Sequence, residues 1–266
     1  MPASSSFPSA RADASAYSLD DPYDFAVKRG PKATPGRADL LRLGLPRGTV
    51  DLTWEHYEDR VRTSEGESLR ERLLDVEFEL PQRLAESSYN GLVLLGSAGA
   101  GKSLGAALLL KSALGLVVPD RGGEDDASRR VTGCFVSASS YLGERRALIS
   151  ASKALDGPRG RGDGGYGELR AWERNLDAVT DVDVLVLDDL GKERSPRGSG
   201  FAESVMESEV LRRRGAAGRL TVVTSNLTLD QLSRYSMSMA SYLHEVGDIV
   251  AIGDSVDYRK RRRPRR

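Results

Sequence analysis

A single eight-residue stretch constrains the fold of this chain more than any other feature of its sequence. The stretch matches the pattern G-x-x-x-x-G-K-[ST]; it follows the short apolar run Gly91–Leu95 and opens a helical pattern over residues 102 to about 114. Glycines let the backbone curl so that successive N–H groups face phosphate oxygens, and the positive end of the following helix adds its field. A strand, a loop and a helix in this order predict a phosphate-binding loop within an α/β fold. The loop residues are Gly96, Ser97, Ala98, Gly99, Ala100, Gly101, Lys102 and Ser103.

Two side chains of this loop have expected roles of their own. Lys102 would reach the β- and γ-phosphates of a nucleoside triphosphate, and the hydroxyl of Ser103 would bind Mg²⁺. The alternative is a glycine-rich turn with a chance lysine–serine pair. The strand before the loop and the helix after it argue against that alternative.

Two adjacent carboxylates follow a second apolar run, residues 182 to 187. Both faces of this run are mostly apolar, so it predicts a buried parallel strand that delivers Asp188 and Asp189 to the edge where open sheets bind ligands. We expect Asp188 to hold Mg²⁺ through water, and Asp189 to orient or deprotonate an attacking water. Many α/β strands end in an aspartate without a catalytic role, so this prediction depends on the loop that precedes it. Two acids facing a triphosphate would repel it unless a divalent cation lay between them.

A third polar group, Asn226, follows the apolar strand predicted over residues 220 to 224. Its amide could donate to the γ-phosphate and accept from the attacking water, which is a positioning role in catalysis. The alternative is that Asn226 only turns the chain before Thr228, which can cap the helix that follows.

Strands alternate with helices along most of the chain, and this pattern is typical of a parallel sheet covered on both faces. A helical lead-in segment is expected over residues 38 to 83, and the α/β core over residues 84 to 258. Further strands are expected over residues 131–137 and 248–252, and further helices over residues 69–84, 139 to about 155, 168 to about 179, 203–214 and 228–235.

The two ends of the chain differ from this core in composition. Residues 1 to 37 are rich in serine, alanine and proline, without a periodic apolar pattern, and predict a disordered arm. The last eight residues, 259 to 266, carry seven of the 39 basic residues, so the formal net charge of zero hides an acidic body with a short basic tail. Such a tail can engage a polyanion or can simply be solvated.

These motifs in this order resemble the AAA+ ATPases of the helicase-loader and transposition-helper group, of the DnaC, DnaI and IstB type. The likeness includes Leu187-Asp188-Asp189-Leu190-Gly191 and Thr224-Ser225-Asn226-Leu227. It begins near Leu43-Gly44-Leu45-Pro46, ends at Asp257-Tyr258-Arg259, and covers roughly four-fifths of the chain.

The resemblance implies a P-loop NTPase (AAA+) fold, a three-layer sandwich with a mostly parallel central sheet. It gives Asn226 a sensor role beside Lys102 and Asp189, and it makes Arg259 a candidate arginine contacting the nucleotide. It also shows a departure, because Ser238 and Tyr242 stand where the family has two arginines.

Neither a serine nor a tyrosine can neutralise charge that develops in a transition state, and an arginine finger contributes about 10³ to 10⁵ in rate in related enzymes. Hydrolysis stimulated by a neighbouring copy is therefore in question for this chain. Arg234, or one of the three arginines at positions 212 to 214, is a possible substitute.

The resemblance implies an ATP-hydrolysing helicase loader in DNA replication, with ATP and Mg²⁺ as cofactors. Its partners would be a replicative helicase and single-stranded DNA, with further copies of the chain in a homo-oligomer. One alternative is a transposition helper that recruits a transposase; another is a nucleotide-dependent DNA-binding module with little turnover.

Composition limits the cellular setting and the kinds of site that the chain can build. Cys134 is the single cysteine, which excludes an intrachain disulfide framework and favours a reducing compartment. No apolar run approaches the roughly 20 residues that span a bilayer. We therefore expect a cytoplasmic protein without membrane contact.

Overall fold

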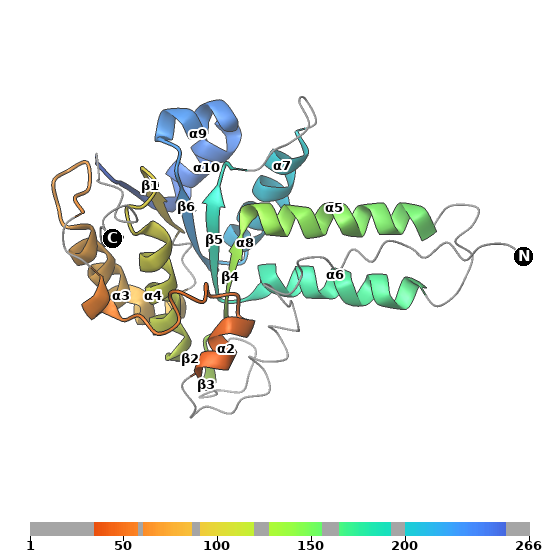
Figure 1. The fold of residues 1–266 in the computed structure, drawn as a ribbon, viewed down its shortest axis with the longest axis horizontal. Helices are drawn as coiled ribbons and strands as arrows, with labels where there is room; N and C mark the ends of the chain where they lie inside the picture. Colours follow the sequence, from red (N-terminus) through yellow and green to blue (C-terminus); the bar gives the residue numbers. More distant parts are fainter. Residues whose placement is uncertain are drawn as a thin grey trace, which may run out of the picture.

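The computed structural model describes residues 35–57, 61–86, 91–119, 128–155, 165–192 and 200–253 (Figure 1). The predicted disordered arm lies outside these residues up to residue 34, and the basic tail with Arg259 lies outside them entirely. The first described helix, α2, covers Arg37–Arg42.

The centre of the molecule is a five-stranded sheet with the order β4-β5-β6-β1-β7. Every neighbouring pair in this sheet is parallel, so the carboxyl ends of the strands lie along one edge. The strands are β1 (Gly91–Leu95), β4 (Gly133–Ser137), β5 (Val184–Leu190), β6 (Leu220–Ser225) and β7 (Gly247–Ala251).

Helices cover both faces of this sheet, which gives the three layers expected from the sequence. Along β1, Leu92 and Leu94 belong to one apolar core, whereas Val93 and Leu95 belong to the other. Successive side chains of a strand point to opposite faces, so a strand buried on both faces must be apolar throughout. The predicted α/β sandwich with a parallel central sheet is therefore confirmed.

The first core contains residues of α3 (Leu69–Glu86) and α4 (Lys102–Leu114). The second contains residues of α5 (Ala138–Leu155), α6 (Gly165–Asp181), α7 (Phe201–Ser204), a π-helix over Val205–Arg212, α9 (Leu229–Tyr235) and α10 (Met237–Val246). The short helix α8 (Arg213–Ala216) continues the π-helix.

The lead-in segment packs directly on the first core. The N–H of Phe135 in β4 donates to the carbonyl of Leu43 over 2.8 Å. The ammonium of Lys111 in α4 donates to the carbonyls of Val50 and Leu52, at 2.9 and 2.6 Å. These contacts fix the lead-in segment beside the helix that carries the phosphate-binding loop.

Several expected elements appear with the predicted bounds, and three features were not expected, of which one is α10 (Met237–Val246). Strand β1 and helix α4 begin and end where the motif placed them, whereas β5 runs on through both acids to Leu190. The sequence pattern predicted neither the antiparallel hairpin β2 (Val117–Pro119) and β3 (Ser128–Arg130) nor the π-helix within the helix expected over residues 203–214.

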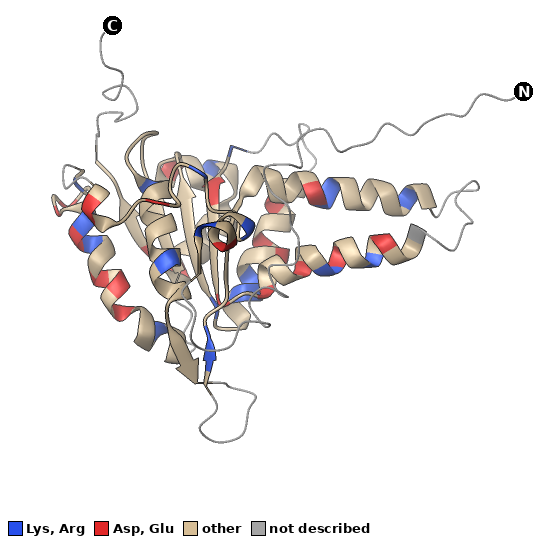
Figure 2. Cartoon of the chain, turned by 60° about the horizontal axis from the view of Figure 1, so that its bottom comes forward, with Lys and Arg blue, Asp and Glu red and all other residues tan. Residues whose placement is uncertain are grey.

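Helices α5 and α6 lie side by side and project from the sheet (Figure 1). Basic and acidic side chains are interspersed along both of them (Figure 2). The described part of this helical pair therefore presents no continuous cationic stripe of the kind that binds polyanions. Across the part of the chain that the structure describes, no helix is long and apolar enough to cross a bilayer.

Candidate functional site

The predicted phosphate-binding loop joins the end of β1 to the start of α4. Gly96 and Gly101 have φ angles of 145° and 86°, which L side chains rarely adopt. A Cβ on Gly96 would also lie 2.8 Å from Ile252, so this position requires glycine for space as well as for its backbone angle. The loop is held from the lead-in side by Tyr57, whose hydroxyl donates to the carbonyl of Gly101 over 3.4 Å.

Lys102 lies inside the curl of this loop and is only 4% exposed. Its ammonium donates to the carbonyls of Gly96 and Ser97, both at 2.7 Å, and to Oδ1 of Asn226 at 2.9 Å. A buried ammonium is stable only where acceptors surround it, and here the loop supplies them. The structure therefore brings together Lys102 and Asn226, two of the predicted catalytic residues.

The end of β5 places both acids beside β6. The register between these strands shifts between Leu187 and Leu190, so the two residues between them leave the regular ladder. Asp189 has a φ of 60°, the only positive value of a non-glycine residue in the described chain. Backbone outliers of this kind persist where surrounding contacts impose them, and they concentrate at functional sites.

Three consecutive residues at the carboxyl end of β6, Thr224, Ser225 and Asn226, make the contacts that hold Asp188 and Asp189. The hydroxyl of Thr224 donates to Oδ1 of Asp188 over 2.6 Å and accepts from the N–H of Asp189 at 3.0 Å. The amide of Asn226 donates to Oδ1 of Asp189 over 3.1 Å. The hydroxyl of Ser225 between them donates to the carbonyl of Leu190 at 2.6 Å. Asn226 thus contacts both Lys102 and Asp189. It therefore does more than turn the chain before Thr228, which was the alternative interpretation of this residue.

Burial raises the pKa of Asp188, although hydrogen bonds from Thr224 and Ser103 act in the opposite direction and the charge of Asp189 raises it further. A carboxylate in this position lacks sufficient positive charge around it, so a cation would stabilise it. Ser103 and Asp188 offer oxygen ligands, which suit Mg²⁺.

Within the described residues, no group of three or more His, Cys, Asp or Glu side chains gathers to hold a metal ion. A site with one carboxylate and one hydroxyl suits Mg²⁺ that is also bound by substrate phosphates, because Mg²⁺ usually binds through one or two carboxylates plus phosphates and water. The donor set therefore agrees with the metal predicted for Ser103 and Asp188.

The site contains a residue that sequence reasoning missed. The ammonium of Lys192 lies 2.7 Å from Oδ2 of Asp189. Only the left-handed backbone at Asp189 and the turn after it return this side chain to the acid. Gly191 indicates a turn, but no residue pattern indicates the left-handed backbone of Asp189.

Ser238 and Tyr242, which stand where the resemblance expects arginines, lie on α10. Both are contacted by Arg212, which comes from the π-helix. The guanidinium of Arg212 lies 4.6 Å from the centre of the Tyr242 ring, and one of its nitrogens lies 3.5 Å from Oγ of Ser238. Glu207 binds both Arg212 and Ser238, at 2.9 and 2.5 Å. Arg212 therefore places a cation beside the exposed Ser238 and the buried Tyr242.

The two arginines that follow Arg212 have other partners. Arg213 pairs with Asp177 and Asp181 of α6. Arg214 is fully buried, and it donates to Oγ1 of Thr221 and to the carbonyls of Val182, before β5, and Leu220, at the start of β6. These contacts give Arg213 and Arg214 structural roles.

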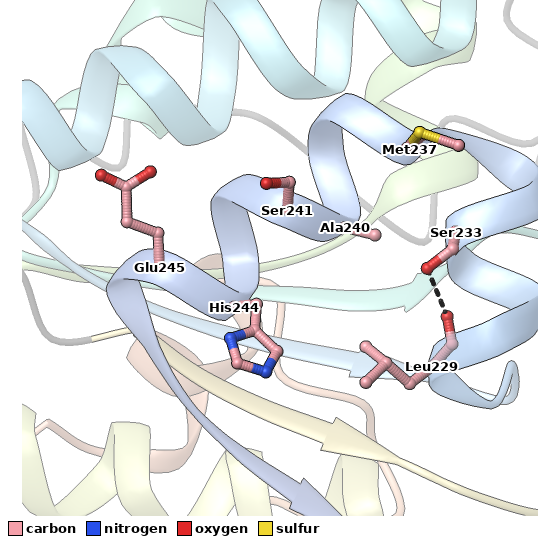
Figure 3. A pocket seen from close by; sticks show the side chains of 7 residues that line it. All are labelled: Leu229, Ser233, Met237, Ala240, Ser241, His244 and Glu245. Carbon is pink, nitrogen blue, oxygen red and sulfur yellow. Dashed lines mark hydrogen bonds between the residues drawn. The ribbon is translucent and has the colours of Figure 1, made fainter.

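A groove of about 480 Å³ lies between α9 and α10 (Figure 3). Leu229 and the 78% exposed Met237 line it together with His244 and Glu245. None of the residues predicted for nucleotide binding lines this groove.

Comparisons with solved structures identify proteins with a similar fold. A putative primosome component from Streptococcus pyogenes serotype M3 matches with a TM-score of 0.50 and 17% identity, over 79% of this chain and 91% of that chain. The DnaC helicase loader matches with a TM-score of 0.46 and 21% identity, over 69% of this chain and 90% of that chain. DnaI matches with a TM-score of 0.42 and 19% identity, over 73% of this chain and 92% of that chain.

No protein-family model matches the sequence, and no curated protein matches it. The match to the putative primosome component shows that the chain shares the fold of that structure. This agrees with the AAA+ fold that the resemblance implied.

Proposed function

We propose that this chain binds MgATP and hydrolyses ATP, and that it uses this cycle as a helicase loader in DNA replication. The observation that supports it most is the continuous contact from Lys102 through Asn226 to Asp189, at the carboxyl edge of the sheet. These groups come from separate parts of the sequence, and ligands of open parallel sheets bind at this edge. The contact therefore supports a role for all three in one site.

The proposed reaction is attack of water on the γ-phosphorus. A bond forms between the water oxygen and phosphorus, the bond to the β–γ bridging oxygen breaks, and ADP leaves with that electron pair. Asp189 orients the water and takes its proton, Lys102 neutralises the β- and γ-phosphates, and Asn226 positions the water against the γ-phosphate. When bound by Ser103, Asp188 and phosphate oxygens, Mg²⁺ would neutralise developing charge.

The proposed client is a replicative helicase on single-stranded DNA. The sequence resemblance points to helicase loaders, and the structure that shares the fold is described as a putative primosome component. A cytoplasmic setting follows from this proposal, because ATP and a replication fork must both be accessible. The six basic residues after Arg259, within positions 260 to 266, would contact DNA phosphates.

A second candidate function is a nucleotide-dependent DNA-binding module with little turnover. Ser238 and Tyr242 favour it, because neither side chain supplies the positive charge that an arginine would provide. The two functions differ in one measurement. Steady-state ATP hydrolysis that rises with single-stranded DNA supports the helicase loader, and tight binding of ATP without turnover supports the binding module.

Calorimetry with MgATP tests the nucleotide site itself. We expect Lys102→Ala to abolish measurable binding, because removing one partner of a buried charged contact costs about 2–5 kcal/mol. Lys153→Ala, which removes an exposed lysine from α5, is the matched control and should bind like the parent. Parental binding or turnover by Lys102→Ala would overturn the assignment.

Affinity capture from the host tests the client. Recovery of a replicative helicase with the full chain supports the proposal. Recovery of a transposase without a helicase would reverse it in favour of a transposition helper.

A further inference from the structure

Lys192 has no role in the proposed hydrolysis, yet it directly contacts Asp189, which is the proposed base. Its ammonium is 2.7 Å from Oδ2 of Asp189, and the two residues are three positions apart. The N–H of Lys192 also faces the carbonyl of Asp189 at 3.4 Å, so the chain closes a tight turn between them.

Residues of β6 hold this turn in place. The backbone, and not only the flexible side chain of Lys192, therefore brings Lys192 to Asp189. Thr224 holds the N–H of Asp189, and Ser225 holds the carbonyl of Leu190. Gly191, with a φ of 88°, completes the reversal. The side chain at position 192 is therefore returned to the acid by the backbone.

Both oxygens of Asp189 accept a contact in this arrangement. Oδ1 accepts from the amide of Asn226, and Oδ2 accepts from the ammonium of Lys192. A base must present an oxygen within hydrogen-bonding distance of the proton that it takes. Each oxygen keeps a further lone pair, so the two partners do not fill the carboxylate; together they fix the direction in which its oxygens face.

The two partners differ in how readily they can leave. Asn226 is also bound to the buried ammonium of Lys102, whereas the side chain of Lys192 is 50% exposed at the rim of the site. Exposed ion pairs are weak, and water can replace their partners at little cost. Lys192 is therefore the partner that is released more easily.

We propose that Lys192 is a positioning residue that holds Asp189 away from the attacking water until their ion pair opens. This inference rests on the proposed ATP hydrolysis. In the described arrangement the acid is held in an inactive orientation, and opening of the ion pair precedes proton transfer to Asp189. Lys192 acts on the acid and not on the phosphates, so it affects turnover and leaves binding of MgATP unchanged.

The test compares variants at position 192 in steady-state ATP hydrolysis by the full chain. Lys192→Met removes the ion pair, and we expect kcat to rise about two- to fivefold, which corresponds to the strength of exposed ion pairs. We expect KM for MgATP to stay at the parental value. Lys192→Arg retains a cation opposite Asp189, and its kcat should return toward that of the parent.

Lys153→Met is the matched control, because it removes the same charge from an exposed position on α5. A higher kcat for Lys192→Met at unchanged KM, absent from Lys153→Met, supports the inference. A lower kcat or a higher KM overturns it, since Lys192 would then contribute its charge to the phosphates. An unchanged kcat, or no turnover in parent and variant alike, also overturns it.

Calorimetry with MgATP on the same proteins separates this inference from the proposed function. If the parent binds no MgATP, the proposed function fails, and the inference fails with it. If the parent binds MgATP and Lys192→Met does not accelerate hydrolysis, only the role of Lys192 fails.

Discussion

The ammonium of Lys102 and the amide oxygen of Asn226 lie 2.9 Å apart, although 124 positions separate them in the sequence. The contact joins the loop after β1 to the exit of β6, and these two strands are neighbours in the sheet. A triphosphate entering the loop must compete for the same ammonium. Binding of phosphate and the orientation of Asn226 are therefore linked.

Asn226→Ala should lower kcat for ATP hydrolysis about 100-fold or more, as loss of one oriented donor does in other active sites. The affinity for MgATP should change much less, because Lys102 keeps its loop carbonyls as partners. Steady-state ATP hydrolysis measures kcat and calorimetry measures the affinity for MgATP, both on the same variant. Asn175→Ala on α6 is the control, and a parental kcat for Asn226→Ala would contradict the positioning role.

Asp188→Asn should stabilise the nucleotide-free protein while abolishing magnesium-dependent turnover. Burial raises the pKa of Asp188, so its charge at neutral pH is less favourable in the fold than in the unfolded chain, and removing the charge raises the free energy of unfolding. Loss of a metal ligand should lower kcat at least about 100-fold. Thermal unfolding without nucleotide checks the first effect, and a lower Tm for Asp188→Asn would contradict it.

Arg212→Ala tests whether the cation beside Ser238 and Tyr242 serves a neighbouring copy of the chain. If copies assemble and Arg212 reaches the adjacent nucleotide, turnover should fall by about 10³ or more. Binding of MgATP should not change, because Arg212 is not part of the loop. Turnover measured against protein concentration checks this, with Arg213→Ala as the control, and equal losses in the two variants would contradict it.

Arg214→Leu should destabilise the fold severely. Arg214 is fully buried, and its guanidinium holds carbonyls of Thr180, Val182 and Leu220. Breaking a buried charged network by removing one partner costs about 3–5 kcal/mol. Urea unfolding measures this, and Arg213→Leu, which removes a partly exposed arginine, should cost about 1 kcal/mol or less.

Cys134 should make the stability of the protein fall in alkaline solution. Burial raises its pKa from 9.0 to about 12, so above pH 9.0 the unfolded chain loses a proton that the fold retains. The contribution of Cys134 is complete below pH 9.0 and about 1.4 kcal/mol smaller at pH 10. Urea unfolding at pH 8 and pH 10 should show this loss in the parent and a smaller one in Cys134→Val. Identical pH dependence in the two proteins would contradict it.

The sequence predicted strand β1, the loop and α4, because the glycine spacing and the Lys-Ser pair at positions 102–103 specify both the loop and its neighbours. It also predicted that Asp188, Asp189 and Asn226 would gather at one edge, since parallel strands end at the same edge.

What the sequence did not predict depends on backbone detail. The ion pair of Lys192 accompanies the left-handed φ of Asp189, which lies within the register shift between β5 and β6. The π-helix that ends at Arg212 has no residue marker, because its wider hydrogen-bonding pattern uses ordinary helical residues. Strands β2 and β3 are three residues each, too short for an alternating pattern to appear.

The hydroxyl of Tyr57 reaches the carbonyl of Gly101, so the lead-in segment is attached to the loop that would hold the phosphates. A shift of Gly101 on phosphate binding would therefore change this contact, and a shift of Tyr57 would change the shape of the loop.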